Sequence, residues 1–134
     1  MKILRDDNLI RISFDEKTSI LETNWKQGSF EKIEIEKLKG IIIEISNFLA
    51  EYKPQYYLAN QWNRGIVYTV DIQSWIADKL VEGAIKGNIK KCAIIQSEDF
   101  IVNLSNEQTL SEAKTTILNK FFVSREKAIE WLIS

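Results

Sequence analysis

Apolar residues recur along this chain with two different periods, and each period predicts a different kind of element. Over residues 31–52 they recur every three or four positions, which predicts a helix about 33 Å long with one apolar face. We expect Ser29 to cap its start, and Gly40 predicts a bend or a close contact within it. The flanking strands favour a helix packed on a sheet over the alternative, a coiled coil of about three heptads. The residues of the apolar face are Ile35, Leu38, Ile41, Ile42, Ile45, Phe48, Leu49 and Tyr52.

A period of two predicts strands over residues 8–14 and 18–26, and the polar residues between them predict a hairpin. The second strand carries Leu21, Thr23 and Trp25 on one face and Ile20, Glu22 and Asn24 on the other. The polar content of the latter face indicates that it is partly exposed. Residues 55–60 and 89–96 are more continuously apolar, which is typical of strands covered on both faces, and we expect residues 55–60 to form an interior strand.

Helices alternate with strands in the rest of the pattern. Residues 69–86 predict a second helix that ends at Gly87 and Asn88. A third helical segment is expected between residues 100 and 113, and a last strand over residues 115–123. Ser124 is expected to cap a short final helix. The side chains expected to bury the second and final helices are Ile72, Trp75, Ile76, Leu80 and Ala84, and Ala128, Trp131 and Leu132.

This order of elements predicts an α/β fold in one domain over residues 1–134. An N-terminal β-hairpin followed by strand–helix repeats predicts a mixed sheet whose later strands are parallel, with the helices packed on the sheet. The length suits one hydrophobic core. No apolar run has the length of a membrane span or a signal peptide, so a cytoplasmic protein is expected.

The amino-acid composition argues against several classes of function and catalytic site. The chain has 18 basic and 19 acidic residues and a net charge of −1, and its lysines form no continuous basic stripe, so nucleic-acid binding is not expected. It has no histidine, which excludes serine–histidine and cysteine–histidine catalysis and disfavours zinc. Cys92, the one cysteine, lies in an apolar run and is interpreted as a small buried hydrophobe rather than a reactive thiol. We expect no cofactor and no metal.

The candidate site is the loop that leaves the carboxyl end of the predicted interior strand, where open α/β sheets place ligands. Its candidate ligand- or partner-binding residues are Asn60, Gln61, Trp62, Asn63, Arg64, Tyr68 and Thr69. Arg64 and the amides of a helix that begins near Thr69 suit an anion. A solvated crossover loop, with Trp62 and Tyr68 packed on the helices, is the alternative. Asp71 with Asp78 or Glu82 could form paired carboxylates. The interpretation preferred here is that Asp71 stabilises the helix start electrostatically and that Asp78 and Glu82, one turn apart on the outer face, are solvated.

The order of elements resembles the SpoIIAA-like branch of the STAS fold, in particular its uncharacterised bacterial members. The likeness rests on the hairpin, the strand–loop–helix over residues 55–75, the strand Lys-Cys-Ala-Ile-Ile at 91–95 and the ending Phe-Phe-Val-Ser-Arg-Glu-Lys-Ala-Ile-Glu-Trp-Leu at 121–132. It implies a non-catalytic module that binds partners or senses ligands. Anti-sigma-factor antagonists carry a phosphorylatable serine after the central strand, whereas this chain has no serine or threonine there before Thr69.

The function expected from the sequence is therefore a non-catalytic regulatory or protein-binding module, with a homodimer as one expected assembly. The alternative is a small-molecule binding or sensing domain that takes an apolar or anionic ligand beside residues 60–69. A third hypothesis, an enzyme of unrecognised type that relies on carboxylates, stays open at this point.

Overall fold

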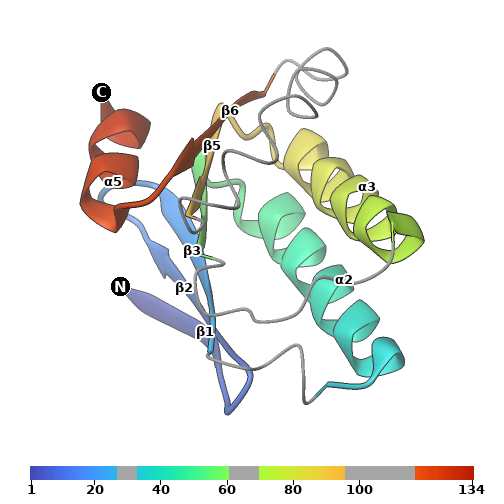
Figure 1. The fold of residues 1–134 in the computed structure, drawn as a ribbon. Helices are drawn as coiled ribbons and strands as arrows, with labels where there is room; N and C mark the ends of the chain where they lie inside the picture. Colours follow the sequence, from blue (N-terminus) through green and yellow to red (C-terminus); the bar gives the residue numbers. More distant parts are fainter. Residues whose placement is uncertain (27–32, 61–69, 96–116) are drawn as a thin grey trace.

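The computed structural model describes residues 1–26, 33–60, 70–95 and 117–134, and these form an α/β protein with a six-stranded mixed sheet and three helices (Figure 1). The strands are β1 (Lys2–Asp6), β2 (Ile10–Asp15), β3 (Ile20–Trp25), β4 (Tyr56–Asn60), β5 (Lys91–Ile95) and β6 (Leu118–Phe122). The helices are α2 (Ile35–Tyr52), α3 (Val70–Lys86) and α5 (Arg125–Ile133). Helices α2 and α3 cover one face of the sheet, and α5 lies on the other.

The strands lie in the sheet in the same order as in the chain, from β1 to β6. The pairs β1–β2 and β2–β3 are antiparallel, and every later pair is parallel. The prediction of an interior strand at residues 55–60 is confirmed, because β4 pairs with β3 on one side and β5 on the other. Leu58 and Ala59 in its middle are buried, which fits a strand covered on both faces.

The predicted hairpin is confirmed as β2 and β3, but the sequence analysis missed strand β1, which extends it to three strands. β1 pairs with β2 through a register that shifts between Ile3 and Arg5. Such an irregularity breaks the strict alternation by which a strand is recognised in a sequence. Arg5 ties β1 to α2, since its guanidinium lies 2.7 Å from a carboxylate oxygen of Glu44 and 2.8 Å from one of Asp7.

Helix α2 begins at Ile35, four residues later than predicted. Its N-cap is Glu34, which has extended backbone angles and makes no side-chain cap hydrogen bond, so the expectation of a cap at Ser29 is wrong. The apolar face of α2 is confirmed and belongs to the main core with residues of β2 and β3, which is the helix-on-sheet arrangement rather than a coiled coil. The helix ends where Lys53 adopts left-handed angles before Pro54.

Helix α3 begins at Val70 and ends at Lys86, within one residue of the prediction. The backbone of α2 approaches this helix closely at two glycines. A Cβ on Gly83 would overlap the carbonyl oxygen of Ser46, and a Cβ on Gly87 would overlap that of Leu49. The Ser46 hydroxyl also donates to the carbonyl of Lys79 at 2.8 Å. The two glycines, one helical turn apart, therefore set the distance between the helices.

Gly40 in α2 behaves differently. A Cβ built there would meet nothing within 4 Å, so the expected close contact at this glycine is absent. Alanine is favoured over glycine in a helix by about 1 kcal/mol, because it loses less conformational freedom on folding. Gly40→Ala should therefore raise the free energy of unfolding by about 0.5–1 kcal/mol, measured as a higher midpoint in urea. A lower midpoint would show that the residue makes a contact which the helix geometry does not reveal.

The final helix is confirmed where the sequence places it. Ser124 is the N-cap, and its hydroxyl accepts a hydrogen bond from the backbone of Lys127 at 3.4 Å. Ala128 and Leu132 are fully buried against the sheet. At the other end of α5, the ammonium of Lys91 donates to the carbonyl of Trp131 at 2.9 Å, as suits the negative end of a helix. The predicted helical segment over residues 100–113 lies outside the described residues.

Candidate functional site

The loop predicted as the site lies almost wholly outside the described residues. Of its seven candidates the structure describes Asn60, whereas Gln61, Trp62, Asn63, Arg64, Tyr68 and Thr69 lie outside, so their role stays a prediction. Asn60 is the last residue of β4, and the register pairs it with Asn24 at the end of β3. Two amide side chains thus stand at the carboxyl ends of neighbouring parallel strands. Alternation places both on the sheet face that carries α5.

The same face carries a buried carboxylate that the sequence analysis did not single out. The side chain of Glu22 in β3 is 7% exposed and forms a two-pronged ion pair with Arg125, the first residue of α5. Arg125 Nε donates to Glu22 Oε2 at 2.9 Å and its Nη2 donates to Oε1 at 2.8 Å. Asn24 adds a third hydrogen bond, from its amide to Oε2 at 2.9 Å. This network joins residues 103 positions apart in the chain.

The network determines the charge of Glu22. Burial alone would raise the pKa of its carboxyl, but the hydrogen bonds from Arg125 and Asn24 and the charges of Arg125 and Arg11 outweigh burial, so the pKa lies below its ordinary value. The same pairing raises the pKa of Arg125. Glu22 is therefore a fixed anion at neutral pH, with both of its oxygens engaged.

The sequence indicated a partly exposed face at Glu22, and this expectation is wrong for Glu22 although Asn24 is indeed only partly buried. The reason is that Arg125 reaches over the strand from the start of α5. The sequence held one signal for this pair. Glu22 shares a strand face with the apolar Ile20, and Arg125 lies in the first turn of a helix expected to dock on the sheet. Strand order, which the sequence does not state directly, is needed to bring them together.

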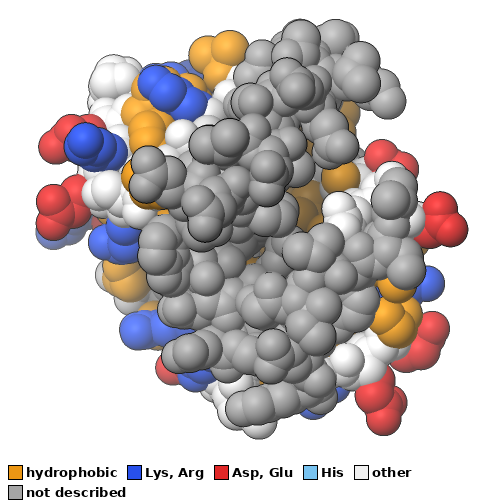
Figure 2. All heavy atoms as spheres, in the orientation of Figure 1, with side chains coloured by type: hydrophobic (Ala, Val, Ile, Leu, Met, Phe, Trp, Pro, Cys, Tyr) orange, Lys and Arg blue, Asp and Glu red, His pale blue; other side chains and the backbone are white. Residues whose placement is uncertain are grey.

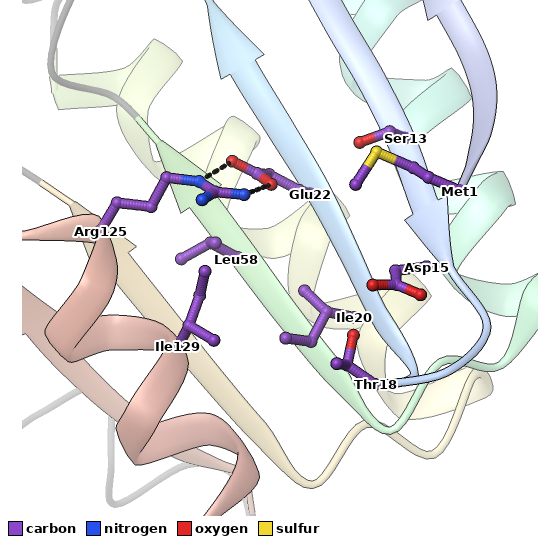
Figure 3. Close-up of a pocket in the computed structure, with 9 residues that line it drawn as sticks. All are labelled: Met1, Ser13, Asp15, Thr18, Ile20, Glu22, Leu58, Arg125 and Ile129. Carbon is purple, nitrogen blue, oxygen red and sulfur yellow. Dashed lines mark hydrogen bonds and ion pairs between the residues drawn. The ribbon is translucent and has the colours of Figure 1, made fainter.

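Beside this ion pair the sheet face is hollowed. A cavity of about 100 Å³ lies between strands β2 and β3 and helix α5 (Figure 3). Its lining side chains come from the two strands, their connecting turn, β4, α5 and the residue before β1. They are Met1, Ser13, Asp15, Thr18, Ile20, Glu22, Leu58, Arg125 and Ile129. The cavity is well below the roughly 300 Å³ at which pockets begin to enclose drug-sized ligands.

Other groups with catalytic potential are held in unreactive states. Cys92 is partly buried, rather than fully buried as expected, and packs against the main core; burial raises the pKa of its thiol to about 12, so the thiol stays protonated at neutral pH. Asp71 and Asp78 are exposed, and exposed Glu82 pairs with Lys86 at 3.2 Å and with Lys79 at 3.6 Å. Hydrogen bonding to Lys86 lowers the pKa of Glu82. Over the described ranges, no three metal-binding side chains gather closely enough to hold an ion.

Comparison with known proteins adds no further constraint. The chain matches no family model, and no curated protein and no solved structure is significantly similar to it. Within the described part, none of the helices is both long and apolar enough to cross a membrane. In Figure 2 acidic and basic side chains are interspersed around the margin of the molecule, in keeping with the balanced charge of the sequence. The described fold and site define an α/β protein with a polar, partly hollowed sheet face next to its terminal helix.

Proposed function

We propose that the protein is a non-catalytic regulatory or protein-binding module, of the kind implied by its resemblance to the SpoIIAA-like branch of the STAS fold. The proposal places the binding surface on the sheet face that carries α5. The observation that supports it most is the network at Glu22. The one buried carboxylate found on this face among the described residues is held as a permanent anion by Arg125 and Asn24.

This network favours binding over catalysis for a physical reason. A general acid or base works best when its pKa lies near the operating pH and one of its oxygens can reach the substrate. The pKa of Glu22 is lowered instead, and its oxygens accept hydrogen bonds from Arg125 and Asn24. The raised pKa of Cys92 works against nucleophilic catalysis in the same way. Both groups are suited to holding the fold in one shape.

The surface next to the network suits a macromolecular partner. Helix α5 packs on β4, β5 and β6, so the part of this face over β1 and β2 has no helix from the described residues on it. Ile3, opposite Ser13 in the register, is 44% exposed there, and Met1 is 74% exposed. We call this region, made of Met1, Ile3 and Asp15, the open half-face; Ser13 lies buried beneath it. Apolar residues bordered by charged ones are typical of protein-binding surfaces.

A second candidate is small-molecule sensing beside Asn60. Asn24 and Asn60 bring two amides to the carboxyl ends of β3 and β4, where ligands bind in open α/β sheets. Native mass spectrometry of freshly purified protein tests this alternative. A co-purifying compound that is lost on Asn60→Ala would favour it over the protein-binding proposal.

Site-specific photo-crosslinking in cells tests the main proposal. A photoreactive amino acid at Ile3 on the open half-face should give one discrete adduct. The same amino acid at Ile43, which is 42% exposed on α2 across the sheet, should give none and is the matched control. The adduct mass separates a second copy of this chain, which would be the expected homodimer, from a different protein. Equal labelling at both positions would contradict the proposal, as would turnover of a metabolite that is lost in a folded Arg64→Ala variant.

A further inference from the structure

Ser13 is the starting point for a more specific statement about the partner. This residue of β2 is only 4% exposed, and it lines the cavity beside α5 (Figure 3). Its hydroxyl has no hydrogen-bond partner in the part of the chain that the structure describes. Buried hydroxyls are nearly always paired with a protein group or with water, so this hydroxyl at the cavity is available to a donor that enters from outside.

The polar groups that line the cavity indicate the chemistry of that group. Glu22 and Arg125 neutralise each other across two hydrogen bonds. Asp15 also lines the cavity, and one of its oxygens accepts the backbone N–H of Lys17 at 3.0 Å. Within the described ranges Asp15 has no cationic partner. The carboxylate of Asp15 and the hydroxyl of Ser13 are therefore two acceptors in one cavity that no described side chain engages, and both accept hydrogen bonds from a cation.

The apolar walls and the volume of the cavity indicate the shape of the group that enters it. Ile20, Leu58 and Ile129 provide apolar walls. The volume of about 100 Å³ is smaller than the roughly 150 Å³ cavity in which benzene binds. An aromatic side chain is thus too large, and a carboxylate would be repelled by Asp15. A lysine side chain has the required form, with a slender four-carbon stem and an ammonium that donates three hydrogen bonds.

We propose that this cavity is the receptor for a single lysine side chain presented by a protein partner. The ammonium donates to the hydroxyl of Ser13 and the carboxylate of Asp15, and the methylenes pack against Ile20, Leu58 and Ile129. The inference rests on the proposed protein-binding function and deepens it. It specifies that the partner presents an exposed lysine where it meets the open half-face.

Titrations followed by ¹H–¹⁵N NMR test the receptor with small probes. Nα-acetyl-lysine methylamide should produce saturable shifts at the amides of Ser13, Asp15 and Ile20. The Nε-acetylated analogue and the norleucine analogue, which lack the positive charge, should bind at least tenfold more weakly. Asp15→Asn should weaken lysine binding at least fivefold. Glu16→Gln, which removes an equal charge from the same turn but outside the cavity lining, should leave the affinity unchanged.

Ser13→Ala distinguishes an effect on lysine binding from an effect on folding, because it should weaken binding without lowering Tm. Loss of an unpaired buried hydroxyl should leave Tm unchanged or raise it, while lysine binding weakens at least threefold. The receptor is overturned if the probe causes no shifts, which indicates a water-filled cavity, or if norleucine binds equally well. It is also overturned if Glu16→Gln weakens binding as much as Asp15→Asn. In each case an adduct at Ile3 would still support the protein-binding module, and only its loss would remove both proposals.

Discussion

Replacing Arg125 with methionine should lower the free energy of unfolding by about 2–3 kcal/mol at pH 7. Removing one partner of a buried ion pair typically costs about 3–5 kcal/mol, because the remaining charge stays buried without compensation. We expect a value at or just below the lower end of that range, since the side chain of Arg125 is 50% exposed while that of Glu22 is 7% exposed. Urea unfolding of both proteins at pH 7 measures the difference directly.

The effect should shrink as the pH falls. The lowered pKa of Glu22 means that its pairing stabilises the native protein fully above the ordinary carboxyl pKa of about 4.3, and that this stabilisation is lost as the pH falls through the lower native value. In Arg125→Met the unpaired carboxyl takes up a proton more readily. The wild-type protein and the variant should therefore approach each other in stability between about pH 5 and pH 3. A difference that is the same at pH 7 and pH 3 would contradict this account.

Two further variants check the cause of the loss. Glu22→Gln should cost less than Arg125→Met, because the arginine that it leaves behind can reach water. The double variant Glu22→Met with Arg125→Met should recover much of the loss, since no buried charge remains. Lys86→Met breaks the exposed Lys86–Glu82 pair and should leave the unfolding midpoint nearly unchanged. If Arg125→Met behaves like this surface control, the pair at Glu22 is not buried in solution.

Gly83→Ala should destabilise the protein by about 2–4 kcal/mol. The added methyl group would overlap the carbonyl oxygen and the Cα of Ser46, which belong to the rigid backbone of α2. Overpacking of a well-filled interior costs about 1–3 kcal/mol, and backbone atoms give way less readily than side chains. The helices would have to separate, which would also strain the hydrogen bond from Ser46 to Lys79. Thermal or urea unfolding measures the loss.

Gly40→Ala is the matched control for this prediction. Both substitutions add the same methyl group within a helix, and alanine has the higher helix propensity at each position. Of these two glycines, Gly83 faces another backbone and Gly40 does not, so the two variants should shift stability in opposite directions. A stable Gly83→Ala variant with an unchanged near-UV spectrum would show that α2 and α3 do not pack as closely as described.

Much of the fold was predictable because burial leaves a periodic pattern in the sequence. The interior strand β4, the hairpin of β2 and β3, the span of α3 and the cap of α5 by Ser124 are all confirmed. Strand β1 was missed because its register shift breaks the alternation. The start of α2 was misplaced because polar, acidic residues before Ile35 look helical, although Glu34 is extended. At Glu34 the tertiary structure overrides the local preference of the sequence for a helix.

The site was harder to predict because it depends on contacts between distant residues. Of the predicted loop the structure describes Asn60, and it places that residue beside Asn24. Glu22 and Arg125 carry no local motif, and their pairing follows only once α5 is known to cross toward β3. The cavity likewise forms only where the turn after β2 and one side of α5 come together in the fold. Such arrangements are properties of the tertiary structure, which periodicity alone does not report.

The sequential order of the strands has a consequence for synthesis on the ribosome. Because each strand pairs with its predecessor, the sheet can grow strand by strand as the nascent chain emerges. Glu22 takes its place early, whereas its counter-ion at Arg125 is made 103 residues later. Until α5 docks, the carboxylate of Glu22 lies in the unfinished sheet without its arginine counter-ion. We therefore expect the ion pair at Glu22 to form only after α5 has been made and has docked, later than the pairing of the first strands.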